Sequence, residues 1–179
     1  MPEHKTVLGI DISLRCPGFA FMREHLLVES HILPEKKVKG KLASIGERLL
    51  TIQHHLRDRY EDEPHPIIWK PVMVPDYVAI EKINVGRTSF DVAKKMAYVE
   101  GVVYMFAQEN DYPLFEVSAK SARADVLGKG KGNLKKHEVG ELVRTIYGES
   151  LTLDETDAIV VALAAQLHTG IITKSPFQK

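Results

Sequence analysis

Apolar residues near the start of the chain fall into short runs that predict β-strands. The runs cover residues 6–12, 18–23 and 26–33, and the short polar interval between the second and third runs is typical of a tight turn. From residue 42 to about residue 59, apolar residues recur three and four positions apart, which predicts a helix. The first third of the chain is therefore expected to form three strands followed by a helix.

Strands and helices alternate in the remainder of the chain. Four prolines fall between Tyr60 and Asp76, so we expect a loop there. The later pattern predicts strands at residues 76–83 and 114–117, and helices at residues 89–110, 118–128, 134–147 and 152–168. Gly101 interrupts the long helix, and we expect a close helix contact to require it. The polar tail after His168 is expected to fray.

This order of elements predicts a single α/β domain that spans residues 1–179, with an ordered core of about 6–168. We expect a mixed five-stranded sheet, antiparallel at its start, with helices on both faces. The last helix opens with a capping box from Thr152 to Glu155. It continues as an almost unbroken apolar run over residues 158–165, which predicts that this helix is buried.

Basic residues concentrate between Ser118 and His137, although the whole chain carries 24 basic and 24 acidic residues and no net charge. This segment contains a single acid, Asp125, and six cations: Lys120, Arg123, Lys129, Lys131, Lys135 and Lys136. A local basic face is what contact with nucleic-acid phosphates requires, so these six residues are candidate DNA-binding residues. The alternative is a solvated lysine-rich loop.

The single cysteine, Cys16, excludes an intrachain disulfide and a cysteine-based zinc site. No apolar run approaches the roughly 20 residues of a membrane span, and the apolar stretch from Thr6 leaves no room for a targeting peptide before it. We therefore expect no membrane partner and a cytoplasmic location in a bacterial or phage-infected cell. An organelle is not excluded.

Acidic residues occur where the pattern predicts buried positions. Asp11 ends the first strand, Glu81 lies within the apolar fourth strand, and Asp154 and Asp157 share one face of the buried last helix. Carboxylates near a sheet interior are costly unless they are paired or bind metal. Their oxygen ligands suit Mg²⁺ or Mn²⁺, and two such ions can promote phosphodiester hydrolysis. The sequence thus predicts one site for two divalent ions.

Each of these acids also has a structural interpretation. Asp11 could cap a turn, Glu81 could pair with a surface lysine, and Asp154 could simply suit the positive end of a helix. Asp157 faces an apolar helix and is harder to explain in this way.

Several segments together resemble the RuvC-type Holliday junction resolvases of the RNase H-like superfamily. They are Leu8-Gly-Ile-Asp-Ile-Ser-Leu-Arg-Cys-Pro-Gly-Phe, Pro75-Asp-Tyr-Val-Ala-Ile-Glu-Lys, the loop at residues 128–137, and Asp154-Glu-Thr-Asp-Ala-Ile. The resemblance covers roughly residues 7–168, nearly the whole chain. It implies an RNase H-like fold and an endonuclease that resolves four-way DNA junctions by paired metal-dependent nicks.

The resemblance also implies roles for individual residues. Asp11, Glu81, Asp154 and Asp157 would form the catalytic, metal-binding tetrad. The protein would act as a homodimer through the helix at about residues 89–110. The longer segment at residues 60–75, and Lys82-Ile-Asn-Val-Gly-Arg where an aromatic wedge is expected, indicate a divergent member, of phage or organelle type. Trp69 could stack on an unpaired base or pack within its loop, and His137 could contact DNA or remain solvated.

Other functions fit parts of this pattern. A less selective flap or branched-DNA nuclease, or an RNA–DNA hybrid nuclease, would share the tetrad. An actin-like ATPase or sugar kinase also begins with Gly-Ile-Asp, but it needs two copies of the fold, for which 179 residues leave no room. A non-catalytic junction-binding protein would be expected to lack one or more of the acids.

Overall fold

The computed structural model describes residues 4–35, 43–60, 73–83 and 89–178. The elements in chain order are β1 (Thr6–Asp11), β2 (Gly18–Arg23), β3 (Leu26–Ile32), α1 (Ile45–Tyr60), β4 (Tyr77–Glu81), α2 (Phe90–Glu109), β5 (Leu114–Val117), α3 (Ala119–Leu127), a 3₁₀ turn (Lys131–Asn133), α4 (Lys136–Tyr147) and α5 (Leu153–His168). All five predicted strands and all five predicted helices are present, with ends that differ by a few residues. Trp69 and most of the proline-rich segment lie outside the described residues.

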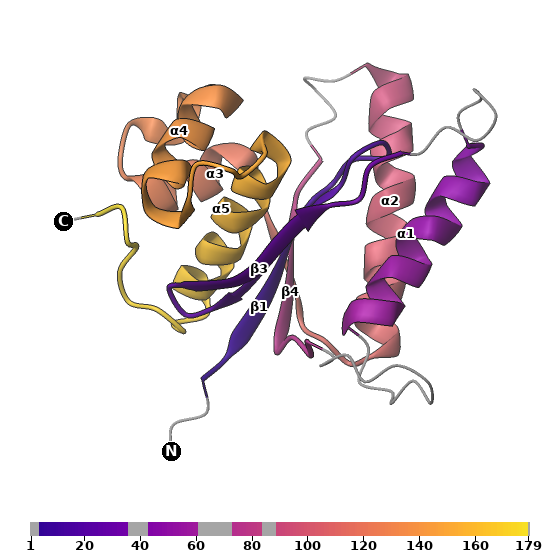
Figure 1. The fold of residues 1–179 in the computed structure, drawn as a ribbon, viewed down its shortest axis with the longest axis horizontal. Coiled ribbons are helices and arrows are strands. Elements are labelled where there is room, and N and C mark those ends of the chain that lie inside the picture. Colours follow the sequence, from indigo (N-terminus) through magenta and orange to yellow (C-terminus); the bar gives the residue numbers. More distant parts are fainter. Residues whose placement is uncertain (1–3, 36–42, 61–72, 84–88, 179) are drawn as a thin grey trace.

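The strands form one mixed sheet in the order β3-β2-β1-β4-β5. Strand β2 is antiparallel to both of its neighbours, β1 and β3, whereas β4 and β5 continue the sheet in parallel with β1. Helices α1 and α2 lie on one side of the sheet, and α3, α4 and α5 lie on the other (Figure 1). The predicted three-layer α/β architecture is confirmed.

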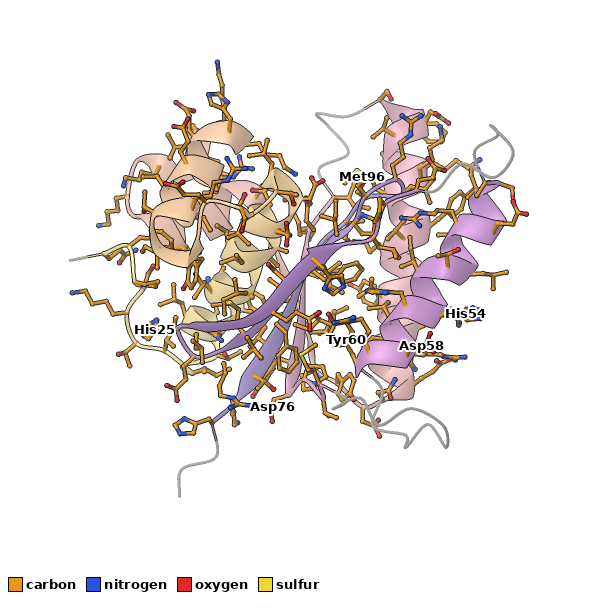
Figure 2. The ribbon with its side chains drawn as sticks, in the orientation of Figure 1. His25, His54, Asp58, Tyr60, Asp76 and Met96 are labelled. Atoms are coloured by element: carbon orange, nitrogen blue, oxygen red, sulfur yellow. The ribbon has the colours of Figure 1, made fainter. Side chains whose placement is uncertain are left out.

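Alternate residues of the central strands supply the two cores, as the period of a strand requires. Val7 of β1 packs with the α5 side of the sheet. Leu8 and Ile10 of the same strand pack with α1 and α2 on the other side. On α1, Tyr60 points toward the sheet while His54 and Asp58 point outward (Figure 2). One face of β1 therefore packs against α5, and the C-terminal end of β1 lies near the acidic first turns of that helix.

The backbone of α5 lies unusually close to the sheet because two strand positions lack side chains. A Cβ atom added to Gly9 would lie 2.3 Å from the carbonyl oxygen of Ala158, and one added to Gly18 would lie 2.3 Å from that of Asp154. Real Cβ atoms do not approach an oxygen so closely. These two glycines thus set the distance between β1, β2 and the first turns of α5.

Two expectations about the chain have different outcomes. No other part of the described chain lies within 4 Å of a Cβ built on Gly101, so the close helix contact expected there is not made inside this chain. The tail does not fray: Ile172 and Ser175 are buried, the Ser175 hydroxyl donates to the carbonyl of Val126 at 2.6 Å, and the Gln178 amide donates to the carbonyl of Asp125 at 2.5 Å. Sequence polarity missed the tail because its anchors bond to backbone carbonyls of α3.

A histidine pair joins β3 to α1 beneath the sheet. The Nε2 atoms of His31 and His55 lie 2.7 Å apart, and the His31 ring stacks on Phe19 with centroids 5.1 Å apart. Burial, with a smaller contribution from the neighbouring His31, lowers the pKa of His55 to about 4. Burial also lowers the pKa of His31. Both rings are therefore packed in their neutral forms.

We expect Gly18→Ala to destabilise the protein by about 1–3 kcal/mol, because the added methyl group must push α5 away from β2. Gly46→Ala on α1 is the matched control, since nothing lies within 4 Å of its added methyl group. The Gly46→Ala control should raise the free energy of unfolding by about 0.5–1 kcal/mol, because alanine favours the helix more than glycine does. Urea unfolding of the two variants measures the difference, and equal effects would contradict the close approach.

We expect the histidine pair to make the fold sensitive to acid. The unfolded pKa of histidine, about 6.5, exceeds the folded pKa of His55, about 4, so the unfolded state binds protons first. The contribution to stability is complete above about pH 6.5 and is lost as the pH falls toward 4. We measure the free energy of unfolding in urea at pH 7.5 and at pH 5.0. Between these pH values it should fall by about 1 kcal/mol less for His55→Gln than for the natural protein, after allowance for solvent screening. His54→Gln, an exposed neighbour, should behave like the natural protein.

Candidate active site

The four predicted acids gather at one edge of the sheet. Asp11 is the last residue of β1 and Glu81 is the last residue of β4. Because these strands are parallel and Ile10 pairs with Ile80, both carboxylates emerge side by side at the same edge. Asp154 and Asp157 lie in the first turns of α5, which the close approach at Gly18 holds against β2.

The ammonium group of Lys136 lies among three of these carboxylates. Its Nζ atom is 2.8 Å from Asp11 Oδ2, 2.7 Å from Asp154 Oδ1 and 3.0 Å from Asp157 Oδ2. Lys136 is the first residue of α4, so the start of this helix faces the start of α5. One positive charge therefore links β1, α4 and α5 at the edge of the sheet.

A second cation approaches the same group from α3. Arg123 donates one guanidinium N–H to the carbonyl of Leu134 at 2.9 Å and another to Asp157 Oδ1 at 3.4 Å. The arginine thus ties the segment that leads into α4 to the acidic face of α5. Asp157 is flanked by Arg123 on one oxygen and by Lys136 on the other.

Burial and mutual repulsion change the protonation of the acids. Burial raises the pKa of Asp11 to about 7, against the opposing attraction of Lys136. Burial also raises the pKa of Glu81, and the charge of Asp157 adds to this effect. Although burial acts to lower it, the carboxylates of Asp11 and Asp157 raise the pKa of Lys136 above its usual value. The four carboxylates outnumber the two cations, Arg123 and Lys136, that contact the site.

The residues present fit a divalent metal ion. Three carboxylate oxygens converge on a single cation, and hard oxygen donors are the ligands that Mg²⁺ and Mn²⁺ prefer. As the side chains lie, no three acidic, histidine or cysteine residues of the described part have the spacing of a bound ion. Oxygens at 2.7–3.0 Å from an ammonium nitrogen are spread more widely than the roughly 2.1 Å contacts of Mg²⁺ allow.

The predicted DNA-binding residues separate into two groups. Arg123 and Lys136 join the carboxylates. Lys120, Lys129 and Lys135 are exposed and Lys131 is partly exposed, all on or between α3 and α4. His137 is also exposed. Lys135 directly precedes Lys136 and therefore borders the acidic site, whereas Lys129 lies toward the other end of α5.

Sequence reasoning missed Arg48, a buried arginine on α1 that binds the backbone of the segment following Asp11. Its guanidinium donates to the carbonyls of Leu14 at 2.8 Å and Arg15 at 2.9 Å, and also to that of Leu33. These contacts fix the segment that follows Asp11. The signal was available, because Arg48 precedes the buried Ile52 by one helical turn and so lies on the apolar face of α1.

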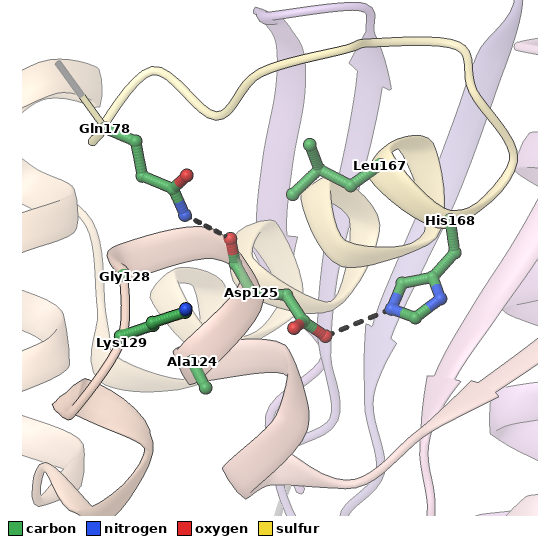
Figure 3. A pocket seen from close by; sticks show the side chains of 7 residues that line it. All are labelled: Ala124, Asp125, Gly128, Lys129, Leu167, His168 and Gln178. Carbon is green, nitrogen blue, oxygen red and sulfur yellow. Dashed lines mark hydrogen bonds and ion pairs between the residues drawn. The ribbon is translucent and has the colours of Figure 1, made fainter.

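A separate cavity of about 630 Å³ lies at the far end of α5. Ala124, Asp125, Gly128, Lys129, Leu167, His168 and Gln178 line it (Figure 3). His168 Nε2 and Asp125 Oδ2 form a hydrogen bond of 3.0 Å in its wall. Because α5 has 16 residues, this cavity is about 20 Å from the carboxylates and is distinct from them.

The chain is similar to proteins of one family. A family model described as crossover junction endodeoxyribonuclease RuvC matches residues 7–165. The RuvC of Citrobacter koseri is 32% identical over 88% of this chain and 84% of its own length. The RuvC of Acidiphilium cryptum is 25% identical over 98% of this chain and 99% of its own length.

Solved structures share the fold. The Thermus thermophilus RuvC structure has a TM-score of 0.69 at 20% identity, covering 93% of this chain and 97% of that one. The same organism's RuvC in complex with a Holliday junction substrate has a TM-score of 0.68 at 19% identity, covering 96% of this chain and 99% of that one.

The mixed five-stranded sheet, in the strand order β3-β2-β1-β4-β5 and with helices on both faces, has the RNase H-like fold of the solved RuvC structures. The family match spans most of the chain. The chain therefore belongs to the RuvC family of crossover junction endodeoxyribonucleases. The predicted fold, family and endonuclease activity are confirmed, and the family's dependence on divalent metal agrees with the acidic site. In the described part of the chain, no helix is both long and apolar enough to span a membrane.

Proposed function

We propose that the protein resolves four-way DNA junctions by metal-dependent nicking, with Asp11, Glu81, Asp154 and Asp157 as its metal-binding catalytic residues. The observation that carries this proposal is the convergence of Asp11, Asp154 and Asp157 on one cation position at the edge of the sheet. Two Mg²⁺ or Mn²⁺ ions per site suit four carboxylates. Such ions supply an activated water and stabilise the leaving oxygen in phosphodiester hydrolysis.

The protein's own groups prepare the site for a phosphate. Arg123 and Lys136 offset the carboxylates that would otherwise repel DNA. The starts of α4 and α5 both border the site, since Lys136 and Asp154 lie in their first turns. Helix N-termini carry partial positive charge and favour anions. A DNA backbone bound at this edge is therefore attracted by two side chains and two helix ends.

Four lysines extend this positive surface beyond the carboxylates. Lys120, Lys129, Lys131 and Lys135 lie on or between α3 and α4 without being part of the acidic cluster. Lys135 directly precedes Lys136 and is exposed, so it is the lysine best positioned to hold the backbone beside the cleaved bond. These contacts carry no sequence information and so suit recognition of DNA shape.

The proposed homodimer uses α2. Tyr98 is 40% exposed and Met105 is 53% exposed, and Gly101 lies between them with open space above it. Positions 98, 101 and 105 fall on one face of the helix. An exposed stripe of this kind, with a small residue at its centre, permits close packing against a second copy of α2. Two copies would present one acidic site to each of two junction arms.

A general branched-DNA or flap nuclease and an RNA–DNA hybrid nuclease remain alternative activities of the same site. A non-catalytic junction-binding role is disfavoured because three of the acids meet at one cation and the fourth, Glu81, interacts electrostatically with Asp157. We propose a cytoplasmic location, in keeping with the bacterial relatives.

We expect the protein to make symmetrical paired nicks in a four-way junction and to spare flap, nicked and linear DNA and RNA–DNA hybrids. Asp11→Asn should lower the cleavage rate at least about 100-fold while junction binding in a gel-shift assay persists, because a metal ligand is lost. Asp125→Asn removes an acid from α3 at the far end of α5 and should cleave normally. Equal cutting of flaps or hybrids would move the function to one of the alternatives, and cleavage by Asp11→Asn would refute the assigned tetrad.

The lysine surface should determine the salt dependence of junction binding. We expect Lys129→Ala combined with Lys135→Ala to reduce the slope of log affinity against log salt concentration by about one to two, because each phosphate contact releases counterions. Lys174→Ala, an exposed lysine in the tail, should leave the slope unchanged. Binding is measured in chelator so that no cleavage occurs. An unaltered slope in the double variant would show that these lysines do not contact phosphate.

Disruption of the α2 stripe should separate the dimer. We expect Tyr98→Glu combined with Met105→Glu to shift the protein to monomer in sedimentation equilibrium, since four like charges would meet across the interface. Leu50→Glu on α1, where the natural leucine is 54% exposed, should leave the assembly unchanged. A natural protein that sediments as a monomer at micromolar concentration would contradict the proposal.

A further inference from the structure

Lys136 lies where a cation would have to bind. Its Nζ atom is within 3.0 Å of oxygens from Asp11, Asp154 and Asp157. We propose, on the basis of the metal-dependent function above, that the Lys136 ammonium group and a divalent ion compete for the same carboxylate oxygens. Metal loading then displaces Lys136 from the site and frees its charge to contact the phosphate of bound DNA.

The geometry makes joint occupancy unfavourable. The three oxygens surround Nζ at 2.7–3.0 Å, whereas Mg²⁺ holds oxygens at about 2.1 Å. To bind an ion the oxygens must draw together around a new centre, which removes the space for the ammonium group. The carboxylates therefore serve one cation or the other.

Lys136 can leave the site without disturbing the helix that carries it. Its side chain is 38% exposed, and a lysine stem is flexible. The start of α4 is held by other contacts: the Lys135 amide donates to Glu138 Oε2 at 2.6 Å, and the Val139 amide donates to the Lys135 carbonyl at 3.1 Å. The backbone can thus stay fixed while the ammonium group swings toward solvent.

Arg123 cannot make the same movement. One of its N–H groups is bound to the carbonyl of Leu134 at 2.9 Å, and only one carboxylate, Asp157, is in contact with it, at 3.4 Å. Its side chain is 16% exposed, less than half the value for Lys136. Arg123 therefore positions Asp157 and the start of α4 in both states, and Lys136 is the exchangeable cation.

The competition is tested by direct metal binding without DNA. Mn²⁺ affinity is measured by electron paramagnetic resonance of free Mn²⁺ for the natural protein, Lys136→Met and Lys135→Met. If Lys136 occupies the site nine-tenths of the time, its removal should tighten Mn²⁺ binding about tenfold. Lys135→Met removes the same charge one residue away, outside the cluster, and should change affinity far less. Unchanged or weaker binding by Lys136→Met overturns the inference while leaving the metal site intact.

A second measurement separates competition from simple charge removal. In chelator, Lys136→Met should unfold at a lower urea concentration than the natural protein, because the carboxylates lose their partner. In saturating Mn²⁺ that difference should vanish, since the loaded natural protein has already lost the contact. A difference that persists in Mn²⁺ overturns the inference. Absence of Mn²⁺ binding by all three proteins would refute the metal site itself, and the inference with it.

The natural protein provides a test that needs no folded variant. In chelator, nitrogen-15 spectra of the lysine ammonium groups should show a signal whose protons exchange slowly with water. This signal comes from the Nζ of Lys136, which contacts three carboxylates. Saturation with Mg²⁺ should abolish that signal, and its survival would overturn the inference.

Discussion

The contact of the α5 backbone with the sheet is the constraint on which the site depends. Gly9 and Gly18 leave no side chain between the strands and the helix, so the first turns of α5 lie directly against β1 and β2. The helix is apolar on nearly every face and buried along most of its length, which holds it there. Asp154 and Asp157 are consequently carried to the carboxylate that ends β1. A thicker layer of side chains at this interface would separate the acids.

That convergence creates an electrostatic cost, and the neighbouring elements offset it. Asp11 and Asp157 are buried acids close to one another. Lys136 at the start of α4 and Arg123 on α3 neutralise part of the charge. Arg48 holds the segment after Asp11 through carbonyl contacts. Helices α3 and α4, which pack beside α5, therefore supply charges to the acidic cluster as well as apolar cover.

The fold was largely predictable because its elements have simple periods. The apolar run of β1 and the capping box at Thr152 each identified an element, and the apolar run of α5 also predicted its burial. The four acids were identifiable because they interrupt apolar patterns. What the sequence did not reveal was the partner of each acid. Lys136 looked like any other lysine of a basic segment, since only the packing of α4 against α5 brings it to Asp11.

Other misses have the same origin. Arg48 lies on the apolar face of α1, but nothing local indicates that three backbone carbonyls await it. The tail looked unstructured because its polar residues bond to the backbone of a distant helix. Gly101 suggested a close helix contact, whereas the space beside it is open within the described part of this chain. Local patterns predict elements, and contacts between distant segments are determined only when the elements pack.

The separation of the acids along the chain also bears on how the protein is made. Asp11 and Asp157 meet at one ammonium group although 146 residues (157 − 11) separate them. At translation rates of about 5–20 residues per second, roughly 7–30 seconds pass between the synthesis of one and the other. The acidic cluster can therefore form only after α5 has been synthesised and has packed against β1. A ribosome-bound chain that lacks α5 has no assembled acidic cluster, so under the proposed function cleavage requires α5 to have been synthesised and packed against β1.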